Sequence, residues 1–314
     1  MSEPIWGIPP DFKDEHQDFY LLGTDNAPDV WHLPKNSWNK IWAKFRGQGE
    51  TIAILDTGCT SHKHLPSFKA SKSFISRESV LDGNAHGTHC AGTALGRDGI
   101  GVAPEASLIV GKVLSNSGSG SSTGIAQGIE WAIDEGATII SMSLGGGSPH
   151  EPTRKAIQRA NDKGILVCAS AGNEGQRLPR NTIGFPGRYL ESYCSGSADR
   201  QGKISSFSSA GREMDGVTPG SSIVSCSNTN PNGYKTMSGT SMSCPFAAGL
   251  FAVIRSGMAM AGAVRLGGIN DWRPWLTQFF MDQGPVGHDP TWGLGIPDYT
   301  KIVAYLAQDE IKWV

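Results

Sequence analysis

The chain has 314 residues, of which 38% are hydrophobic and 18% are charged. This composition suffices for one large α/β domain or two small ones, and it excludes a disordered or collagen-like chain. The formal net charge is −2 and there is no long block of Lys or Arg, which argues against binding to a nucleic-acid backbone. We therefore expect one globular body with no nucleic-acid partner.

The N-terminus carries no basic region followed by an apolar run, and we expect no later run long and apolar enough to span a bilayer. The sequence as given predicts a cytoplasmic protein with no membrane partner. Cysteines stand at positions 59, 90, 168, 194, 226 and 244. They would permit disulfides in a small secreted domain, but in a chain this long without a signal peptide we expect free thiols.

Residues 1–47 differ from the rest of the chain. Segment 11–18 is polar, and prolines at 4, 9, 10, 28 and 34 oppose long regular structure. We interpret this part as an N-terminal arm ahead of a single domain at 48–314. One interpretation is that the arm only wraps the surface, anchored by Trp31, Trp38 and Trp42. The other is that it regulates the domain.

From residue 50 onward, short β-type runs alternate with segments of helix length. Strands are expected at 51–56, 107–113, 137–143, 164–170 and 222–226, and helices at 86–96, 122–135, 151–163 and 241–257. This alternation predicts an α/β fold of three layers, with a mostly parallel central sheet covered by helices on both faces. Chemistry is then expected at the carboxyl ends of strands, where Asp56 stands.

Three motifs carry residues for nucleophilic catalysis. Asp56 ends an apolar run in Asp-Thr-Gly, His86 opens His-Gly-Thr-His, and Ser241 lies in Gly-Thr-Ser-Met just before the apolar run 246–254. A serine is weakly nucleophilic and needs a base, which in turn needs an orienting group. We predict that His86 takes the proton of Ser241 while Asp56 stabilises the imidazolium. Each motif alone is more often a turn or a surface residue; the prediction depends on the three together.

In this order the motifs resemble the catalytic segments of the subtilisin-like serine proteases, or subtilases, with intracellular subtilisins and proteinase-K-like sequences the most similar in character. The resemblance covers roughly residues 48–300 and implies the subtilisin-like fold and a serine endopeptidase acting on polypeptides with broad preference. It also implies that Asn173 and the Ser241 backbone N–H form the oxyanion hole, and that His89 packs beneath the site. The alternatives are a protease dedicated to one peptide precursor, or a subtilase-fold protein that only binds a peptide.

The resemblance further implies where a substrate would lie. Two edges would pair with an extended peptide through main-chain hydrogen bonds, and a pocket would hold the P1 side chain, which precedes the cleaved bond. A large apolar P1 residue is expected because Gly184 has no side chain to fill the pocket, and Glu174 at the rim could accept a basic one. The residues of the edges and pocket are Gly118, Gly120, Ser143, Leu144, Gly145, Gly146, Gly172, Glu174 and Gly184.

No cofactor is expected for catalysis. The family's strong calcium site should be absent, because His64 stands near the place of a ligating Asp and segment 94–104 is short. Gly187 and Asp199 are the candidates for a weaker calcium site. A zinc site built from Cys59, His86, His89 and Cys90 has no C-x2-C pair to support it. The resemblance implies instead that Cys59 and Cys90 pack near the triad.

The arm also resembles a family feature. Intracellular subtilisins carry a short N-terminal segment with an Ile-Pro element that lies across the cleft, and Ile8-Pro9-Pro10 is similar. Proline lacks an N–H and has a fixed φ, so such a segment could bind without being cut. The arm is therefore a candidate intramolecular inhibitor. Intracellular relatives also suggest a homodimer.

Overall fold

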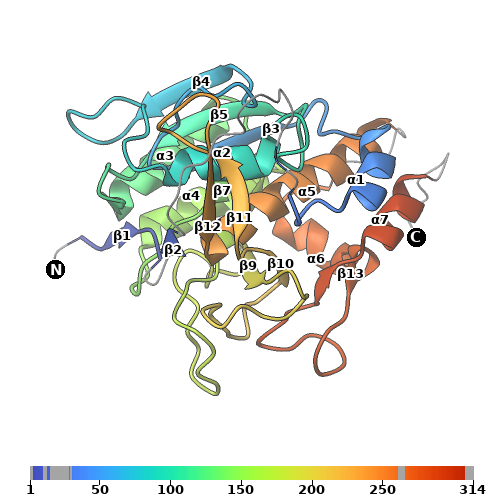
Figure 1. The fold of residues 1–314 in the computed structure, drawn as a ribbon. Coiled ribbons are helices and arrows are strands. Elements are labelled where there is room, and N and C mark those ends of the chain that lie inside the picture. The colour runs from blue at the N-terminus through green and yellow to red at the C-terminus, as the bar shows by residue number, and fades with distance from the viewer. Residues whose placement is uncertain (1–2, 10–12, 15–27, 29, 261–265, 308–314) are drawn as a thin grey trace.

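A seven-stranded parallel sheet forms the centre of the computed structural model, which describes residues 3–9, 13–14, 28, 30–260 and 266–307. The strands follow the order β10-β9-β8-β7-β3-β5-β4 (Figure 1). They are β3 (Thr51–Asp56), β4 (Phe68–Ser73), β5 (Ser107–Lys112), β7 (Ile139–Met142), β8 (Leu166–Ser170), β9 (Tyr193–Ala198) and β10 (Gly216–Pro219). The predicted α/β fold with a parallel sheet is confirmed.

The sheet is buried on both faces, and β3 shows why its sequence is continuously apolar. Successive side chains of a strand point to opposite faces. Ile52 and Ile54 belong to one core cluster, and Ala53 and Leu55 belong to the other. An all-parallel sheet needs such apolar residues on both faces because helices cover both of them.

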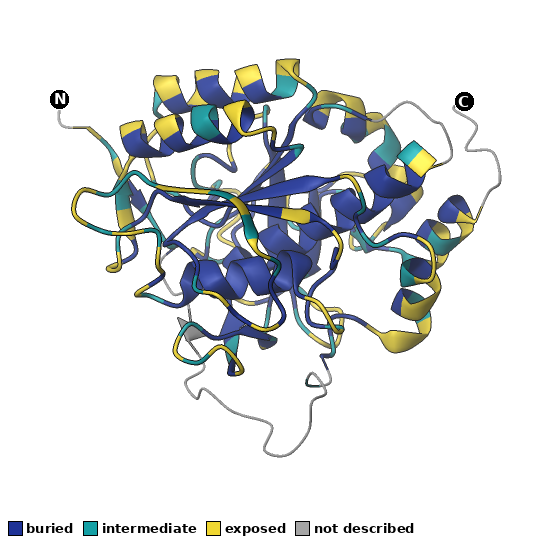
Figure 2. Ribbon diagram, turned by 90° about the horizontal axis from the view of Figure 1, so that it is seen from above, coloured by how far each residue is buried: buried dark blue, intermediate teal, exposed yellow. Residues whose placement is uncertain are grey.

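Helices pack on each side of this sheet; several have buried inner faces and exposed outer faces, and others are buried almost all round (Figure 2). The core on one face takes in α1 (Lys35–Trp42), α2 (His86–Leu95), α5 (Thr240–Met260), α6 (Ile269–Phe279) and α7 (Tyr299–Leu306). The core on the other face takes in α3 (Ser122–Asp134) and α4 (Glu151–Asp162). The expected three layers are present.

Helix α5 corrects the expectation that no run could span a bilayer. By length and composition it is long and apolar enough to do so. However, 94% of its most apolar window is buried inside the protein. It is therefore a core helix, flanked by α2 and the sheet, and its apolarity is explained by that burial.

The order of the strands fixes where a site can form. The chain adds β4 and β5 on one side of β3 and then β7, β8, β9 and β10 on the other. Ligands of open parallel sheets bind outside the carboxyl ends of the strands where this direction changes. Asp56 ends β3 at that point.

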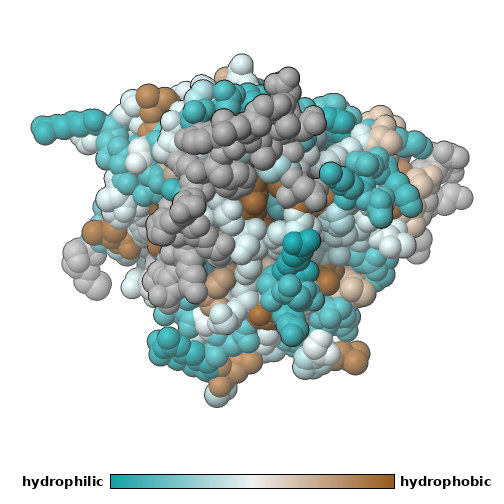
Figure 3. Space-filling model, viewed as in Figure 1, coloured by the Kyte–Doolittle hydropathy of each residue, from teal (hydrophilic) through white to brown (hydrophobic). Residues whose placement is uncertain are grey.

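Short sheets complete the fold. Strand β1 (Ile5–Gly7) pairs with β6 (Ser119–Ser121), and β13 (Phe280–Met281) pairs with β14 (Ile296–Pro297). Strand β12 (Tyr234–Ser238) pairs with both β11 (Ile223–Cys226) and β2 (Lys13–Asp14). The arm thus contributes one strand to each of two small sheets. On the face shown in Figure 3, apolar side chains of the described residues are scattered among hydrophilic ones.

Candidate active site

Asp56 and His86 form a buried hydrogen-bonded pair. The Asp56 Oδ1 atom lies 2.8 Å from His86 Nδ1, and both residues are buried. A second donor, the Thr57 N–H, reaches the same oxygen at 2.7 Å. Because a carboxylate only accepts, Nδ1 carries the imidazole proton and Nε2 is left as an acceptor. This is the tautomer that a histidine general base requires.

A second carboxylate, which sequence reasoning missed, sets the position of His86. Asp82 is buried and accepts hydrogen bonds from the backbone N–H groups of Ala85 and Thr88 at 3.0 and 2.8 Å. It caps the N-terminus of α2, where Ala85 at the N-cap has no side-chain acceptor and a left-handed φ of 89°. The Thr57 hydroxyl donates to Asp82 at 2.9 Å and accepts from the Gly87 N–H at 2.9 Å.

The Thr57 hydroxyl therefore connects the end of β3 to the start of α2. Thr57 directly follows Asp56, and Gly87 directly follows His86. One side chain thus ties together the two backbone positions that carry the predicted acid and base. We call the Thr57–Asp82–Gly87 contacts the hydroxyl clamp.

Ser241 is the second residue of α5 and is completely buried. Its Oγ makes no hydrogen bond to any residue that the structure describes. Its carbonyl would normally accept from the N–H four residues on, but residue 245 is proline and has none. The carbonyl instead accepts from Ser143 Oγ at 2.7 Å and from Cys90 Sγ at 3.4 Å. Proline at this place therefore allows α5 to be fastened to β7 and α2 beside the serine.

Asn173 follows β8 and is held in one orientation. Its Oδ1 accepts from both the N–H and the hydroxyl of Thr240, at 3.0 and 2.9 Å. Its Nδ2 is buried and has no hydrogen-bond partner among the described residues. A buried donor without an acceptor is costly, and this one extends from a residue locked to the neighbour of Ser241. Such a donor suits an oxygen that becomes negative during a reaction.

Cys90 lies beside this group, with its Sγ 3.9 Å from His86 Nδ1. Asp56, His86 and Cys90 offer ligand atoms that lie within 4.8 Å of one another. However, burial raises the pKa of the Cys90 thiol well above its usual value, and metals bind the thiolate. With Nδ1 also committed to Asp56, the arrangement does not favour zinc.

His89, the second histidine of the motif, has a different environment. Its Nε2 lies 2.9 Å from the Ile223 carbonyl and 3.1 Å from that of Lys235. Burial lowers its pKa to about 3, so it is neutral and donates from this nitrogen. It fastens α2 to the β11–β12 hairpin.

The N-terminal arm occupies the two predicted edges. Gly7 exchanges hydrogen bonds with Gly145, N–H to carbonyl, at 2.9 and 2.7 Å. On the other side Gly7 pairs with Ser119 and Trp6 with Gly120, and the Ile8 N–H reaches the Gly118 carbonyl at 3.0 Å. The arm is thus the middle strand between the two edges.

Trp6 is the side-chain anchor of this strand. It is 1% exposed and belongs to the same core cluster as Leu144. A Cβ at Gly146 would collide with the indole ring. Ile5, its neighbour on the opposite face of the strand, is 74% exposed.

A cavity of about 370 Å³ opens beside Asn173. Gly184, predicted for the P1 pocket, Glu174, predicted for its rim, and Gly172, predicted to bind substrate, line it, and Pro9 of the arm lies at the same cavity. Its lining also includes Arg177, Arg180 and Arg188, which sequence reasoning did not single out.

The two weak-calcium candidates, Gly187 and Asp199, have different neighbours. The Asp199 carboxylate accepts from the N–H groups of Gln201 and Lys203 in its own turn, while Gly187 packs against the Ser170 carbonyl. Shortly after Gly187 in the sequence, two backbone carbonyls accept hydrogen bonds from an arginine. Arg273 donates to the carbonyls of Leu190 and Ser192 and to the buried carboxylate of Asp215.

His64, predicted near the place of a strong-site calcium ligand, is also committed to protein partners. Its Nδ1 lies 2.9 Å from Asp98 Oδ2 and its Nε2 lies 2.8 Å from the Tyr234 hydroxyl. These contacts tie the segment after β3 to the loop after α2 and to β12.

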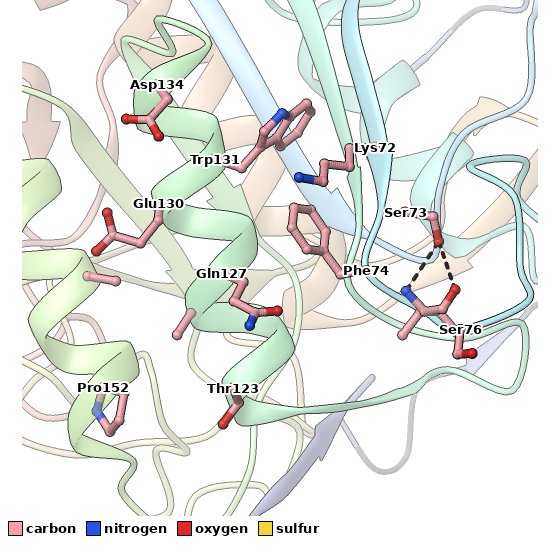
Figure 4. A pocket seen from close by; sticks show the side chains of 13 residues that line it. Lys72, Ser73, Phe74, Ser76, Thr123, Gln127, Glu130, Trp131, Asp134 and Pro152 are labelled. Atoms are coloured by element: carbon pink, nitrogen blue, oxygen red, sulfur yellow. Dashed lines mark hydrogen bonds between the residues drawn. The ribbon is translucent and has the colours of Figure 1, made fainter.

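A larger groove, of about 910 Å³, lies between the end of β4 and helices α3 and α4. Figure 4 shows Phe74 and Trp131 across from each other in it, with Gln127 and Glu130 projecting from α3. None of Asp56, His86, Asn173 and Ser241 lines this groove. Cavity size alone would therefore have pointed away from the residues with chemistry.

A parallel sheet with the buried Asp56–His86 pair at its switch point and a serine at the start of α5 is typical of an α/β serine hydrolase. Residues 47–265 match the model of the subtilase family, and the chain belongs to that family. It is a subtilisin-like serine endopeptidase.

Three relatives illustrate the similarity. Subtilisin DY of Bacillus licheniformis is 41% identical over 232 residues, which are 71% of this chain and 83% of the relative. Subtilisin Savinase of Lederbergia lenta is 40% identical, over 67% of this chain and 77% of the relative. A thermostable alkaline protease of Halalkalibacterium halodurans is 42% identical, over 67% of this chain and 58% of the relative.

Proposed function

We propose that Asp56, His86 and Ser241 are the catalytic triad of this endopeptidase. His86 Nε2 takes the Ser241 proton as the hydroxyl attacks a peptide carbonyl, and then gives that proton to the leaving amine. Asp56 holds the imidazole in the required tautomer and stabilises the imidazolium. The observation that carries this proposal is the buried 2.8 Å contact between Asp56 and His86.

Asn173 and the Ser241 N–H serve as the oxyanion hole in this proposal. Support comes from the Asn173 amide, whose oxygen is held by Thr240 while its nitrogen has no partner among the described residues. This nitrogen would donate a hydrogen bond to the substrate oxygen as the carbonyl carbon becomes tetrahedral and the oxygen becomes negative. An interaction made mainly in the transition state raises kcat rather than affinity.

The substrate is an extended polypeptide bound between the edges at 118–120 and 143–146. Main-chain hydrogen bonds of the kind that the arm makes there require little of the substrate's sequence, which favours broad preference. The alternative is a protease that processes one dedicated precursor. A subtilase-fold protein that only binds peptides is disfavoured by the complete set of catalytic side chains.

The arm is an intramolecular inhibitor in this proposal. It pairs with both edges, the buried Trp6 side chain anchors it, and its Pro9 lies at the cavity beside Asn173. Beyond the site it pairs with β12 just before the Ser241 motif. The nucleophile is completely buried in this state. Pro10, the last residue of the Ile8-Pro9-Pro10 element, lies outside the described residues.

Catalysis needs no metal ion in this scheme, because the triad supplies both proton transfer and nucleophile. We also propose that the enzyme works in a cytoplasmic, thiol-reducing compartment. All six cysteines are buried and none is paired with another, so no disulfide supports the fold. The homodimer stays a prediction.

Covalent labelling tests the triad. A fluorophosphonate should label the wild-type protein, and Ser241→Ala should abolish both labelling and peptide cleavage. The matched control is Ser243→Ala, two residues along the same helix, whose hydroxyl donates to the Thr240 carbonyl. Labelling of Ser241→Ala at the wild-type rate would contradict the proposal. Cleavage of a peptide library then separates broad preference from a single processed sequence.

A further inference from the structure

The cavity beside Asn173 has an unusual charge for its position. Arg177, Arg180, Arg188 and Glu174 are its charged lining residues, three positive groups against one negative. None of the three arginines makes an ion pair with a residue that the structure describes. The chain as a whole carries a net charge of −2, so the cationic lining is a local feature.

The rest of the lining is uncharged, and part of it is apolar. This part includes Ala171, Ile183 and several glycines. Gly184, which has no side chain, leaves room for that of a substrate. Such walls take the methylene part of a substrate side chain without competing for its polar end. Arg188 lies over the Phe185 ring, with its guanidinium carbon 5.7 Å from the ring centroid, which restrains that side chain near the cavity.

From this lining we infer that the P1 pocket selects an acidic side chain, with glutamate the best fit. The inference rests on the proposed function, because it assigns this cavity to the residue before the cleaved bond. The glutamate methylenes would lie along Ile183 and the glycines, and its carboxylate would accept hydrogen bonds from the arginines. Guanidinium groups bind carboxylates through paired N–H donors, and such bonds are among the strongest in proteins.

The arm is consistent with this assignment. Pro9 lies at the cavity and carries no charged group, so it cannot form an ion pair with a guanidinium. A substrate with an acidic P1 residue would therefore form an ion pair that Pro9 cannot. This assignment also reverses the expectation that Glu174 would attract a basic residue, since one carboxylate faces three guanidinium groups.

Four peptides that differ only at P1 test the inference on the full chain. We expect kcat/KM to be at least about tenfold higher for P1 glutamate than for isosteric glutamine at low salt, with lysine poorer still. The ratio of glutamate to glutamine should fall toward one at about 0.5 M NaCl, because salt screens exposed charges. P1 phenylalanine tests the earlier expectation of a large apolar residue: it should be cleaved less efficiently than glutamate, and a preference for phenylalanine would overturn the inference.

Variants assign the effect to the arginines. The triple variant Arg177→Ala, Arg180→Ala, Arg188→Ala should remove the preference for glutamate over glutamine, and Glu174→Gln should increase it. Arg212→Ala is the matched control, because Arg212 is an exposed arginine outside the cavity lining and should leave the ratio unchanged. A ratio of two substrates on one preparation does not depend on how much of a variant is folded.

The inference is overturned if glutamine equals glutamate at low salt, if lysine is preferred, or if the ratio survives the triple variant. Those outcomes leave the proposed function intact as long as Ser241→Ala abolishes cleavage of all four peptides. Cleavage that persists in Ser241→Ala would instead overturn the proposed function.

Discussion

Asn173 shows how a single side chain can be prepared for one step of a reaction. Replacing it with alanine should lower kcat by about 10²- to 10³-fold while KM changes little, because its free amide hydrogen is used mainly in the transition state. Steady-state kinetics on one peptide measure both constants. The control is Thr240→Ser, which keeps both donors to Asn173 Oδ1 and should retain activity. A rise in KM at unchanged kcat would show that Asn173 acts in binding.

The hydroxyl clamp makes Thr57 a positioning residue. Thr57→Val has nearly the same shape but cannot connect Asp82 to Gly87, so Asp56 and His86 lose a shared restraint. We expect kcat to fall about 10- to 100-fold, since small displacements of reacting groups have effects of this size. Thr57→Ser keeps the hydroxyl and should restore most of kcat. Equal kcat for the valine and serine variants would mean that the hydroxyl has no such role.

The residues that sequence reasoning located differ from those it missed in how local their signals are. Asp56, His86 and Ser241 stand in short motifs whose neighbours are part of the pattern. Asp82 carries no such pattern, because its partners lie at 57 and in the first turn of α2 and come together only in the fold. The cavity arginines were missed for the same reason, since residues at 177, 180 and 188 meet around a pocket that the sequence does not display.

At the scale of elements, β1 is the part of the arm that can be tested most directly. Trp6→Ala removes the buried anchor while leaving the main-chain hydrogen bonds possible, and truncation of a buried aromatic side chain costs about 3–5 kcal/mol. We expect the initial rate on a small peptide to rise at least about tenfold in consequence. Ile5→Ala is the matched control, since Ile5 is the exposed neighbour on the same strand. Equal rates for both variants and wild type would contradict inhibition by the arm.

Helix α6 carries Arg273, whose guanidinium binds two backbone carbonyls and the Asp215 carboxylate. Removing it in Arg273→Ala leaves the Asp215 carboxylate buried without its partner, where burial already raises the carboxyl pKa. The expected loss of unfolding free energy is about 3 kcal/mol. Millimolar Ca²⁺ should recover part of this loss in the variant, since two carbonyls and a carboxylate are then free.

Thermal unfolding with and without calcium measures both effects. The wild-type melting temperature should respond neither to Ca²⁺ nor to EDTA, because the Arg273 guanidinium already satisfies these oxygens. Arg212→Ala, which changes an exposed arginine, should melt like wild type. Loss of stability in wild type on adding EDTA would contradict this picture and indicate a metal elsewhere.

Strands and helices with a clear hydrophobic pattern were predicted well, whereas those with a weak pattern were missed. The expected strand at 51–56 and helix at 151–163 match β3 and α4 almost residue for residue. Strand β4 was missed because it is an edge strand in which lysines alternate with small residues, which blunts its β-type pattern. Helix α1 was missed because prolines precede it and only Trp38 and Ile41 are buried.

At the scale of the whole molecule, alternation of strands and helices predicts a parallel sheet with two covered faces, but it does not give the order of the strands. That order comes from which apolar faces pack together. It places Asp56 at the switch point and brings residues from β7, β8 and α5 to it. The sequence therefore predicts that a site exists and which motifs belong to it, while the clamp and the charge of the pocket depend on the completed fold.

The molecule should lose stability in mild acid because it buries neutral histidines. Burial lowers the pKa of His32 to about 4 and that of His89 to about 3, whereas an unfolded chain has about 6.5. Between these values the unfolded state binds protons that the folded state excludes. The stabilisation is thus complete above about pH 6.5 and is lost as the pH falls toward 4, by up to about 1.4 kcal/mol per pH unit for each histidine.

Calorimetry from pH 8 to pH 5 tests this prediction. The melting temperature should be nearly constant above pH 7 and fall increasingly below it. His32→Gln keeps a donor for the Ile100 carbonyl but does not titrate. Unfolding of this variant should take up about one proton fewer, so its melting temperature should fall less steeply as the pH is lowered. A slope equal to that of wild type would mean that His32 already binds protons in the folded state. The contact between its ring and Phe246 would then have to break often enough to expose the imidazole.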